Sequence, residues 1–228
     1  MSTRTETATC DPTRAAPRNA RNARDTARTL PLATVRTLAA SAHIGDLVFI
    51  RVTARPFREV ADATGSWINH VGIVVDTSGA EPVVAESTFP WAKLTPLSRF
   101  VARSEGGRLA LARLATPPTA DEQRRVHAAA ERRIGTLYDT GFNLRSRRQF
   151  CSRYVREVLG DATGVELGDV ETFATLLERR PGAKLGFWRM WYFGRIPWSR
   201  ETVTPASLIH SSKLTLEFDG IVFDPGRV

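Results

Sequence analysis

The sequence is poor in cysteine and has no long apolar run, and each shortage excludes a class of protein. Its 228 residues include only two cysteines, Cys10 and Cys151, in segments of opposite character. A structural disulfide is therefore not expected, and reduced thiols favour a cytoplasmic location. No segment approaches the roughly 18 apolar residues of a membrane-spanning helix, and the N-terminal segment lacks the continuous apolar stretch of a secretory signal peptide.

Motifs for bound metals and cofactors are also missing. The four histidines are scattered, the cysteines lack the paired spacing of zinc ligands, and no acidic residue stands at helical spacing from a histidine in a known metal motif. A glycine-rich phosphate loop is absent too. We therefore expect neither a metal nor a cofactor.

Acidic residues are scarce near the N-terminus. Residues 1–36 hold seven arginines against three acidic residues, a net charge of +4 that is half of the +8 on the whole chain. Because these arginines are scattered among Thr, Ala, Asn and Pro, the composition predicts a disordered basic leader, followed by one domain over residues 37–228. The charge is compatible with peripheral contact with an acidic membrane, whereas no specific nucleic-acid partner is expected, and the oligomeric state stays open.

Apolar, β-branched runs bounded by turn residues predict strands over 45–52, 67–75, 81–86 and 108–114. The turn between the second and third runs predicts a hairpin centred on Ser78, which places His70 opposite Glu86. Directly opposed residues have β-carbons about 4.5 to 5.5 Å apart, so Glu86 would hold one nitrogen of the His70 imidazole. Asp219-Gly220 predicts a second, terminal hairpin.

Cys151 opens a predicted amphipathic helix that ends at Gly160. A cysteine at a helix N-terminus lies at the positive end of the helix dipole, and Arg147 and Arg148 precede it, so both effects favour the thiolate. On this evidence alone the opposite interpretation is stronger, because a single cysteine on a helix is more often a small buried hydrophobe. The inward stripe of the helix comprises Phe150, Tyr154, Val155, Val158 and Leu159.

Taken together, Cys151, His70 and Glu86 supply the three groups of a cysteine hydrolase. A thiolate attacks a carbonyl carbon, a histidine takes and returns the proton, and a third polar group fixes the imidazole. The histidine and the glutamate precede the cysteine in the chain, which is the reverse of the order in papain.

Six short phrases occur in a fixed order: Gly45–Phe49, His70–Val74, Val84–Ser87, Tyr138-Asp139 with Phe142, Phe150–Ser152 and Thr204–Leu208. In that order they resemble the circularly permuted papain-like cysteine hydrolases of the YebB/YiiX type, a branch of the NlpC-like amidases and peptidases. The resemblance covers roughly residues 44–209. It implies an α+β fold in which a small antiparallel, β-barrel-like sheet packs on helices, with Cys151 as nucleophile, His70 as base and Glu86 as the orienting residue.

One residue departs from the family pattern. Family members commonly have an acidic residue where this chain has Arg153, immediately after the Phe150–Ser152 phrase. The added positive charge would either favour the thiolate further or bind an acidic substrate. Arg153 is therefore a candidate substrate-binding residue.

The preferred function is a cofactor-free thiol hydrolase that cleaves an amide or ester through an acyl-enzyme on Cys151. Its substrate would be a peptide, an amino-acid conjugate or an acyl lipid. The Cys151 backbone N–H would form part of the oxyanion hole, and Tyr138 and Tyr154 are candidates for a further donor.

Two alternatives stay open. Aromatic residues between Trp188 and Trp198 suggest a lipid acyltransferase if they form a substrate wall or a membrane-facing rim, although such clusters are more often core. The other alternative is a basic binding module with a vestigial triad, which would keep its function after Cys151→Ala.

Overall fold

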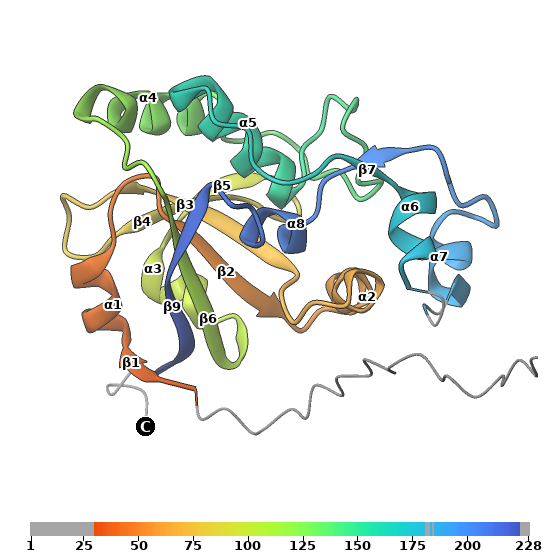
Figure 1. The fold of residues 1–228 in the computed structure, drawn as a ribbon, viewed down its shortest axis with the longest axis horizontal. Coiled ribbons are helices and arrows are strands. Elements are labelled where there is room, and N and C mark those ends of the chain that lie inside the picture. Colours follow the sequence, from red (N-terminus) through yellow and green to blue (C-terminus); the bar gives the residue numbers. More distant parts are fainter. Residues whose placement is uncertain (1–29, 181–182, 184, 224–228) are drawn as a thin grey trace, which may run out of the picture.

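A seven-stranded sheet forms the centre of the fold in the computed structural model, which describes residues 30–180, 183 and 185–223 (Figure 1). Neighbouring strands run antiparallel except β1 and β9, which are parallel. A two-stranded ladder joins β7 (Glu171–Thr172) and β8 (Glu201–Thr202). The strand order of the large sheet is β1 (Leu32–Thr34), β9 (Leu214–Phe223), β6 (Ser104–Leu114), β2 (Leu47–Val52), β3 (His70–Asp76), β4 (Val83–Ser87) and β5 (Ala92–Pro96).

The sheet is open, with β1 and β5 as its edges in the part of the chain that the structure describes. The α+β class is therefore as expected, but the barrel-like form of the sheet is not confirmed. A closed barrel needs a ladder between its first and last strands. Here the two edge strands each pair on one side.

Helices cover both faces of the sheet. In Figure 1, α4 and α5 lie along one face, α1 and α3 lie on the other, and α6 and α7 stand beside the sheet. The helices are α1 (Val35–Ser41), α2 (Arg55–Thr64), α3 (Leu97–Val101), α4 (Ala120–Glu131), α5 (Cys151–Thr163), α6 (Phe173–Glu178), α7 (Leu185–Trp191) and α8 (Pro205–Ile209).

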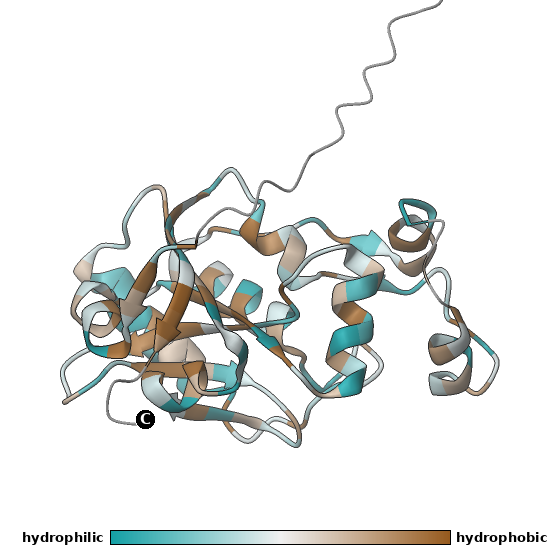
Figure 2. Cartoon of the chain, turned by 90° about the horizontal axis from the view of Figure 1, so that it is seen from below, coloured by the Kyte–Doolittle hydropathy of each residue, from teal (hydrophilic) through white to brown (hydrophobic). Residues whose placement is uncertain are grey.

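The apolar run of β2 explains why two helical layers are needed. Leu47 and Phe49 belong to the core shared with α4 and α5, whereas Val48 and Ile50 belong to the core shared with α1 and α3. Successive side chains of a strand point to opposite faces, so a strand that is apolar throughout must be covered on both sides. Figure 2 shows the resulting concentration of hydrophobic residues on the central strands.

The predicted strands correspond to β2, β3, β4 and β6. The predicted end of the helix that starts at Cys151 was wrong. Gly160 lies inside α5, which continues to Thr163. The helix ends where Gly164 adopts a left-handed φ of 74°. A glycine tolerates this conformation without steric cost, which makes Gly164 the C-cap.

The predicted terminal hairpin was also wrong, because β9 runs unbroken from Leu214 to Phe223. Gly220 serves a close approach instead of a turn. A β-carbon at this position would lie 2.2 Å from the carbonyl oxygen of Pro31. The glycine thus lets the residue before β1 pack directly on β9, and the Ile221 N–H donates to the same oxygen at 2.9 Å.

Regular structure begins before residue 36, the expected end of the basic leader. Residues 32–34 form β1, and α1 begins at Val35 with the Thr34 hydroxyl accepting from the Thr37 N–H. Residues 1–29, with Cys10, lie outside the described residues. Among those described, no helix is long and apolar enough to cross a membrane.

Candidate active site

Cys151 is the first residue of α5, the 13-residue helix on one face of the sheet. Phe150 precedes it in extended conformation and gives the helix no side-chain cap. The first N–H groups of a helix have no acceptor within the helix, and they carry its partial positive charge. The thiol and the Cys151 N–H therefore share an electropositive position, and the Cys151 side chain also lines a pocket.

His70 starts β3 and is fully buried. Its Nε2 lies 2.6 Å from Glu86 Oε2, a contact between two side chains that solvent does not reach. The other ring nitrogen, Nδ1, has no oxygen or nitrogen partner among the described residues. The Cys151 thiol acts on the ring from close range, so Nδ1 is the nitrogen left to exchange a proton with it.

Glu86, on β4, accepts from three side chains, two of which the sequence analysis missed. The Thr95 hydroxyl donates to Oε1 at 2.7 Å, and Arg103 Nη2 lies 2.7 Å from both carboxylate oxygens. Thr95 comes from β5 and Arg103 follows α3. The carboxylate is thus fixed from three directions, which in turn fixes the plane of the His70 ring.

The pKa shifts of the pair follow from these contacts. Burial alone lowers the pKa of His70, but the neighbouring Cys151 side chain and the Glu86 carboxylate outweigh that effect and raise the pKa from 6.5 to about 9. Burial alone raises the pKa of Glu86, but His70 and Arg103 outweigh it and lower the pKa from 4.5 to about 2. Near neutral pH the arrangement therefore favours a charged His70–Glu86 pair.

The contact between His70 and Glu86 was expected, but the expected register of the hairpin was wrong. In the β3–β4 ladder Ile73 pairs with Ala85 and Val74 with Val84, so Glu86 is diagonal to His70 instead of directly opposite. The shift amounts to two residues, which keeps each side chain on the same face of the sheet. For that reason the long His and Glu side chains still meet.

Gly72 makes room for the ring that supports His70. Phe100, from α3, stacks on the imidazole with ring centroids 5.6 Å apart. A β-carbon on Gly72 would lie 2.4 Å from Val84 Cγ1 and 2.9 Å from the Phe100 ring. The glycine of the His70–Val74 phrase is therefore explained by close packing behind the histidine.

Gly72→Ala is expected to destabilise the protein by about 1–3 kcal/mol, the usual cost of overpacking a core, and to displace Phe100 from His70. Gly160→Ala provides the matched control, because nothing lies within 4 Å of a β-carbon there. That change, inside a helix, should stabilise by about 0.4–1 kcal/mol. Urea denaturation of both variants measures the two signs, and equal stability of the two would contradict the packing argument.

Tyr138 lies beside the thiol, as its candidate role requires. Its hydroxyl is buried and has no oxygen or nitrogen partner among residues 30–180, 183 and 185–223. Burial, and after it the neighbouring Cys151 and Asp139, raise the pKa of Tyr138 well above its usual value. The hydroxyl therefore keeps its proton at neutral pH and is available as a donor.

The Tyr138-Asp139 phrase holds that hydroxyl in place. The Asp139 carboxylate accepts from the Gly141 N–H at 2.8 Å and the Asn143 N–H at 3.0 Å, which closes a tight turn. Within this turn Phe142 packs edge-on against the Tyr138 ring at 6.4 Å. The phrase is thus a structural support for the tyrosine.

Tyr154 does not meet the expectation that it is a donor at the site. Its hydroxyl donates to the Ala130 carbonyl oxygen at 3.0 Å, in the buried contact between α5 and α4. Burial raises the pKa of Tyr154 above its usual value. The residue joins two helices and is not a candidate oxyanion ligand.

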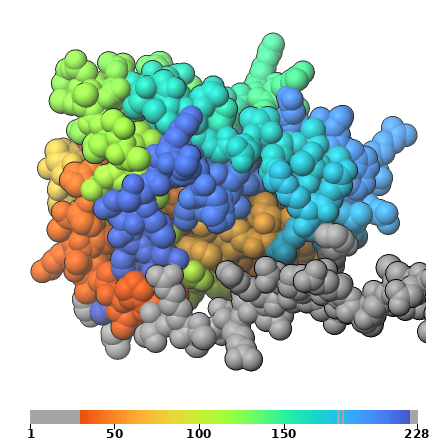
Figure 3. All heavy atoms as spheres, viewed as in Figure 1, coloured from red at the N-terminus to blue at the C-terminus, as the bar shows by residue number. Residues whose placement is uncertain are grey.

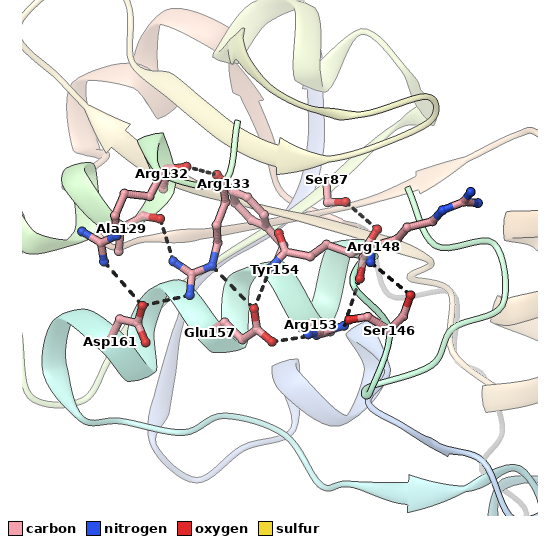
Figure 4. Close-up of polar contacts among 12 residues, drawn as sticks. Ser87, Ala129, Arg132, Arg133, Ser146, Arg148, Arg153, Tyr154, Glu157 and Asp161 are labelled. Atoms are coloured by element: carbon pink, nitrogen blue, oxygen red, sulfur yellow. Dashed lines mark hydrogen bonds and ion pairs between the residues drawn. The ribbon is translucent and has the colours of Figure 1, made fainter. Parts of the chain in front are cut away.

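Arg153 is likewise occupied elsewhere, which corrects its expected role in binding an acidic substrate (Figure 4). Its Nε donates to Glu157 Oε1 at 2.6 Å, one turn further along α5. Its Nη1 donates to the carbonyl oxygens of Ser146 at 2.7 Å and Arg148 at 2.9 Å. The guanidinium thus braces the loop that leads into Cys151, and the side chain is only 14% exposed.

The aromatic residues between 187 and 198 divide between two environments. Phe187 and Trp188 are buried, and Trp188 forms part of the wall of the pocket that Cys151 lines. Phe193 and Trp198 are 95% and 44% exposed. The cluster is therefore part core, part pocket wall and part surface.

Comparison with known proteins identifies the family to which this site belongs. The model of the permuted papain-like amidase enzymes, the YaeF/YiiX or C92 family, matches residues 41–216, well over half of the chain. The chain belongs to this family. Among its relatives, YiiX of Escherichia coli strain K12 is 27% identical over 186 residues, which are 81% of this chain and 90% of YiiX.

A solved structure agrees with the family fold. The crystal structure of metalloprotein YiiX from Escherichia coli O157:H7 matches with a TM-score of 0.69 and 24% identity, over 78% of this chain and 98% of that one. At this identity the match supports the fold alone. The permuted papain-like resemblance is confirmed by the family match, and with it a hydrolase of the amidase or peptidase type.

Proposed function

We propose that this permuted papain-like amidase is a cysteine hydrolase that forms an acyl-enzyme on Cys151. The observation that carries the proposal is the buried line Cys151–His70–Glu86, in which each group is within reach of the next. A nucleophile, a base and a residue that orients the base are the parts such a reaction needs. Glu86 is held by Thr95 and Arg103, so the base is preorganised.

The proposed first step transfers the acyl group to sulfur. Cys151 Sγ attacks the carbonyl carbon while His70, charged near neutral pH, holds the proton of the sulfur on Nδ1. The developing oxyanion accepts from the Cys151 N–H and the Tyr138 hydroxyl. As the C–N or C–O bond of the substrate breaks, His70 returns the proton to the departing nitrogen or oxygen and a thioester remains.

The second step releases the acid. His70 takes a proton from a water molecule, whose oxygen attacks the thioester carbonyl. The C–S bond then breaks, and the proton on His70 is available to the departing sulfur. The product is the carboxylic acid, and Cys151 returns to its starting state.

No step of the proposal is assigned to a metal, although the solved YiiX structure is that of a metalloprotein. Among the described residues, no group of three His, Cys, Asp or Glu side chains is arranged so that it could hold a metal ion. Both oxygens of Glu86 already accept from cationic or hydroxyl groups, and the Arg103 guanidinium beside them would repel a cation. The donor set of the site therefore does not fit a metal.

The proposal predicts that a para-nitrophenyl ester with an alkyne tag on its acyl group acylates Cys151. His70→Ala should slow this acylation at least a hundredfold, because a general base usually contributes about 10² to 10⁴ to the rate. Intact-mass measurement and peptide mapping locate the acyl group. His43→Ala is the matched control, because His43 is exposed. Equal acylation of the wild type and His70→Ala, both folded by circular dichroism, would refute the role of the base.

A further inference from the structure

A second pocket lies between β5 and α3, beside Glu86 and separate from the pocket that the nucleophile lines. Its wall includes Thr95 and Arg103, the two residues that fix the Glu86 carboxylate. It encloses about 800 Å³ of empty space, part of it open to solvent. Elsewhere segments from the first third of the chain lie against segments from its last third (Figure 3). This pocket, in contrast, is lined by one short stretch, residues 93–103.

The wall of this pocket carries positive charge and no negative charge. Lys93, Arg99 and Arg103 belong to it, and no Asp or Glu of the described chain does. Lys93 and Arg99 are exposed, and neither forms an ion pair with a carboxylate in the part of the chain that the structure describes. Even Arg145, which is mostly exposed, pairs with Glu201. The pocket therefore holds positive charge that the described residues do not neutralise.

The local structure directs these cations toward one place. Lys93 is directly opposite Glu86 in the β4–β5 ladder, so both side chains lie on the same face of the sheet. Glu86 forms its ion pairs with His70 and Arg103, which leaves Lys93 without a share of the carboxylate. Arg99, in the last turn of α3, precedes Arg103 by four residues, or about one helical turn. Converging cations of this kind attract an anion that carries more than one charge.

Arg103 has hydrogen-bond donors to spare. Its Nη2 lies 2.7 Å from both oxygens of Glu86, but its Nη1 forms no hydrogen bond with the described residues, and its Nε is buried without a partner. Buried polar groups without a partner are rare, since each one costs free energy. The side chain is 31% exposed, so a ligand can reach the guanidinium. Phosphate oxygens are well suited to accept from the N–H groups of an arginine.

We propose that this pocket binds a phosphate group, either free phosphate or a phosphate monoester of a small molecule, through Lys93, Arg99 and Arg103, and that the bound phosphate regulates the active site. The regulatory part rests on the proposed cysteine hydrolase function. Arg103 touches both the pocket and Glu86, so a bound phosphate shares its positive charge with the carboxylate. Glu86 then attracts the proton of His70 more strongly.

Binding is tested by isothermal titration calorimetry of inorganic phosphate and of glycerol 3-phosphate into the full chain, at neutral pH and constant ionic strength. Saturable binding at one site is expected. Arg99→Gln should weaken it about tenfold or more, because a charge-assisted contact with the anion is lost. Arg195→Gln, which removes an exposed cation after α7, is the matched control and should leave the affinity unchanged.

The two titrants distinguish the sources of the phosphate group. Tighter binding of glycerol 3-phosphate would support a phosphate monoester as the ligand, and equal or weaker binding would support free phosphate. Absence of saturable binding of either compound would overturn the site. Equal losses of affinity in Arg99→Gln and Arg195→Gln would overturn it as well, because the anion would then respond to the overall charge and not to the pocket.

Regulation is tested by nuclear magnetic resonance titration of the His70 ring with and without saturating phosphate. The groups that face this ring with charge are Cys151 and Glu86, and Arg103 acts on it through Glu86. Phosphate should raise the pKa of His70 above its value of about 9 in the wild type but not in Arg99→Gln. An unchanged pKa despite binding would overturn the regulation. A raised pKa in a protein that turns over no ester or amide would support the pocket and its link to His70 and refute the hydrolase.

Discussion

Replacing Cys151 with alanine is expected to lower kcat for ester or amide cleavage by about a thousandfold or more, as removal of a covalent nucleophile does in other hydrolases. Without sulfur no thioester forms, and only His70 and the oxyanion donors remain to assist the attack of water. The cysteine is 3% exposed and alanine fits within its volume, so the fold should persist. Steady-state kinetics with a para-nitrophenyl ester measure the loss.

Two further variants distinguish loss of the nucleophile from other effects of replacing a cysteine. Cys151→Ser keeps a small polar side chain at the first position of α5, yet its hydroxyl is a weaker nucleophile, so kcat should remain far below that of the wild type. Cys10→Ala removes the other cysteine and should have no effect on turnover. Wild-type turnover in Cys151→Ala would refute Cys151 as the nucleophile. Absence of turnover in the wild type as well would favour the basic binding module over the hydrolase.

The strands and the triad residues could be predicted because their signals are local. The buried strands β2 and β3 are continuous apolar runs, and such runs bounded by glycine and aspartate are typical of strands covered on both faces. The positions of His70 and Glu86 on one hairpin then followed from the turn between them. Even an error of two residues in register left both on the same face.

The residues that support Glu86 could not be predicted in the same way. Thr95 lies on β5, a short edge strand that starts after Pro90 and ends at Pro96, so its sequence suggests a loop. Arg103 is one of many arginines, and nothing local marks it as the one that reaches a buried carboxylate. Long-range packing of α3 against the sheet decides which cation arrives there.

Arg153 and Tyr154 illustrate the opposite error, in which closeness in sequence suggested closeness in function. Both follow Cys151 within one turn of α5, yet Arg153 reaches back to the Ser146 carbonyl oxygen and Tyr154 reaches across to α4. In a helix each residue turns by about a quarter of a circle, so neighbours in sequence face different surroundings. Tyr138, which is 13 residues from the cysteine in sequence, is the tyrosine that faces it.

Glu86→Ala is expected to destabilise the protein by about 3–5 kcal/mol, the usual cost of removing one partner of a buried ion pair. Arg103 and a protonated His70 would then face each other without the carboxylate between them. Urea denaturation at neutral pH measures the loss. The matched control is Glu105→Gln, whose surface ion pairs with Arg51 and Arg58 are worth at most about 1 kcal/mol.

The pH dependence identifies the cause of that loss. The pKa of Glu86 falls from 4.5 to about 2 on folding, so its contribution to stability is complete above pH 4.5 and is lost as the pH falls toward 2; Glu86→Gln should lack this acid-sensitive part. The pKa of His70 rises to about 9, so protonation of a departing amine should fail, and kcat/KM for an amide substrate decline, as the pH passes about 9. Because Glu86 helps to raise that pKa, Glu86→Gln should move the decline to lower pH. An unchanged alkaline limb in the folded variant would mean that Glu86 supports the structure but does not set the proton affinity of His70.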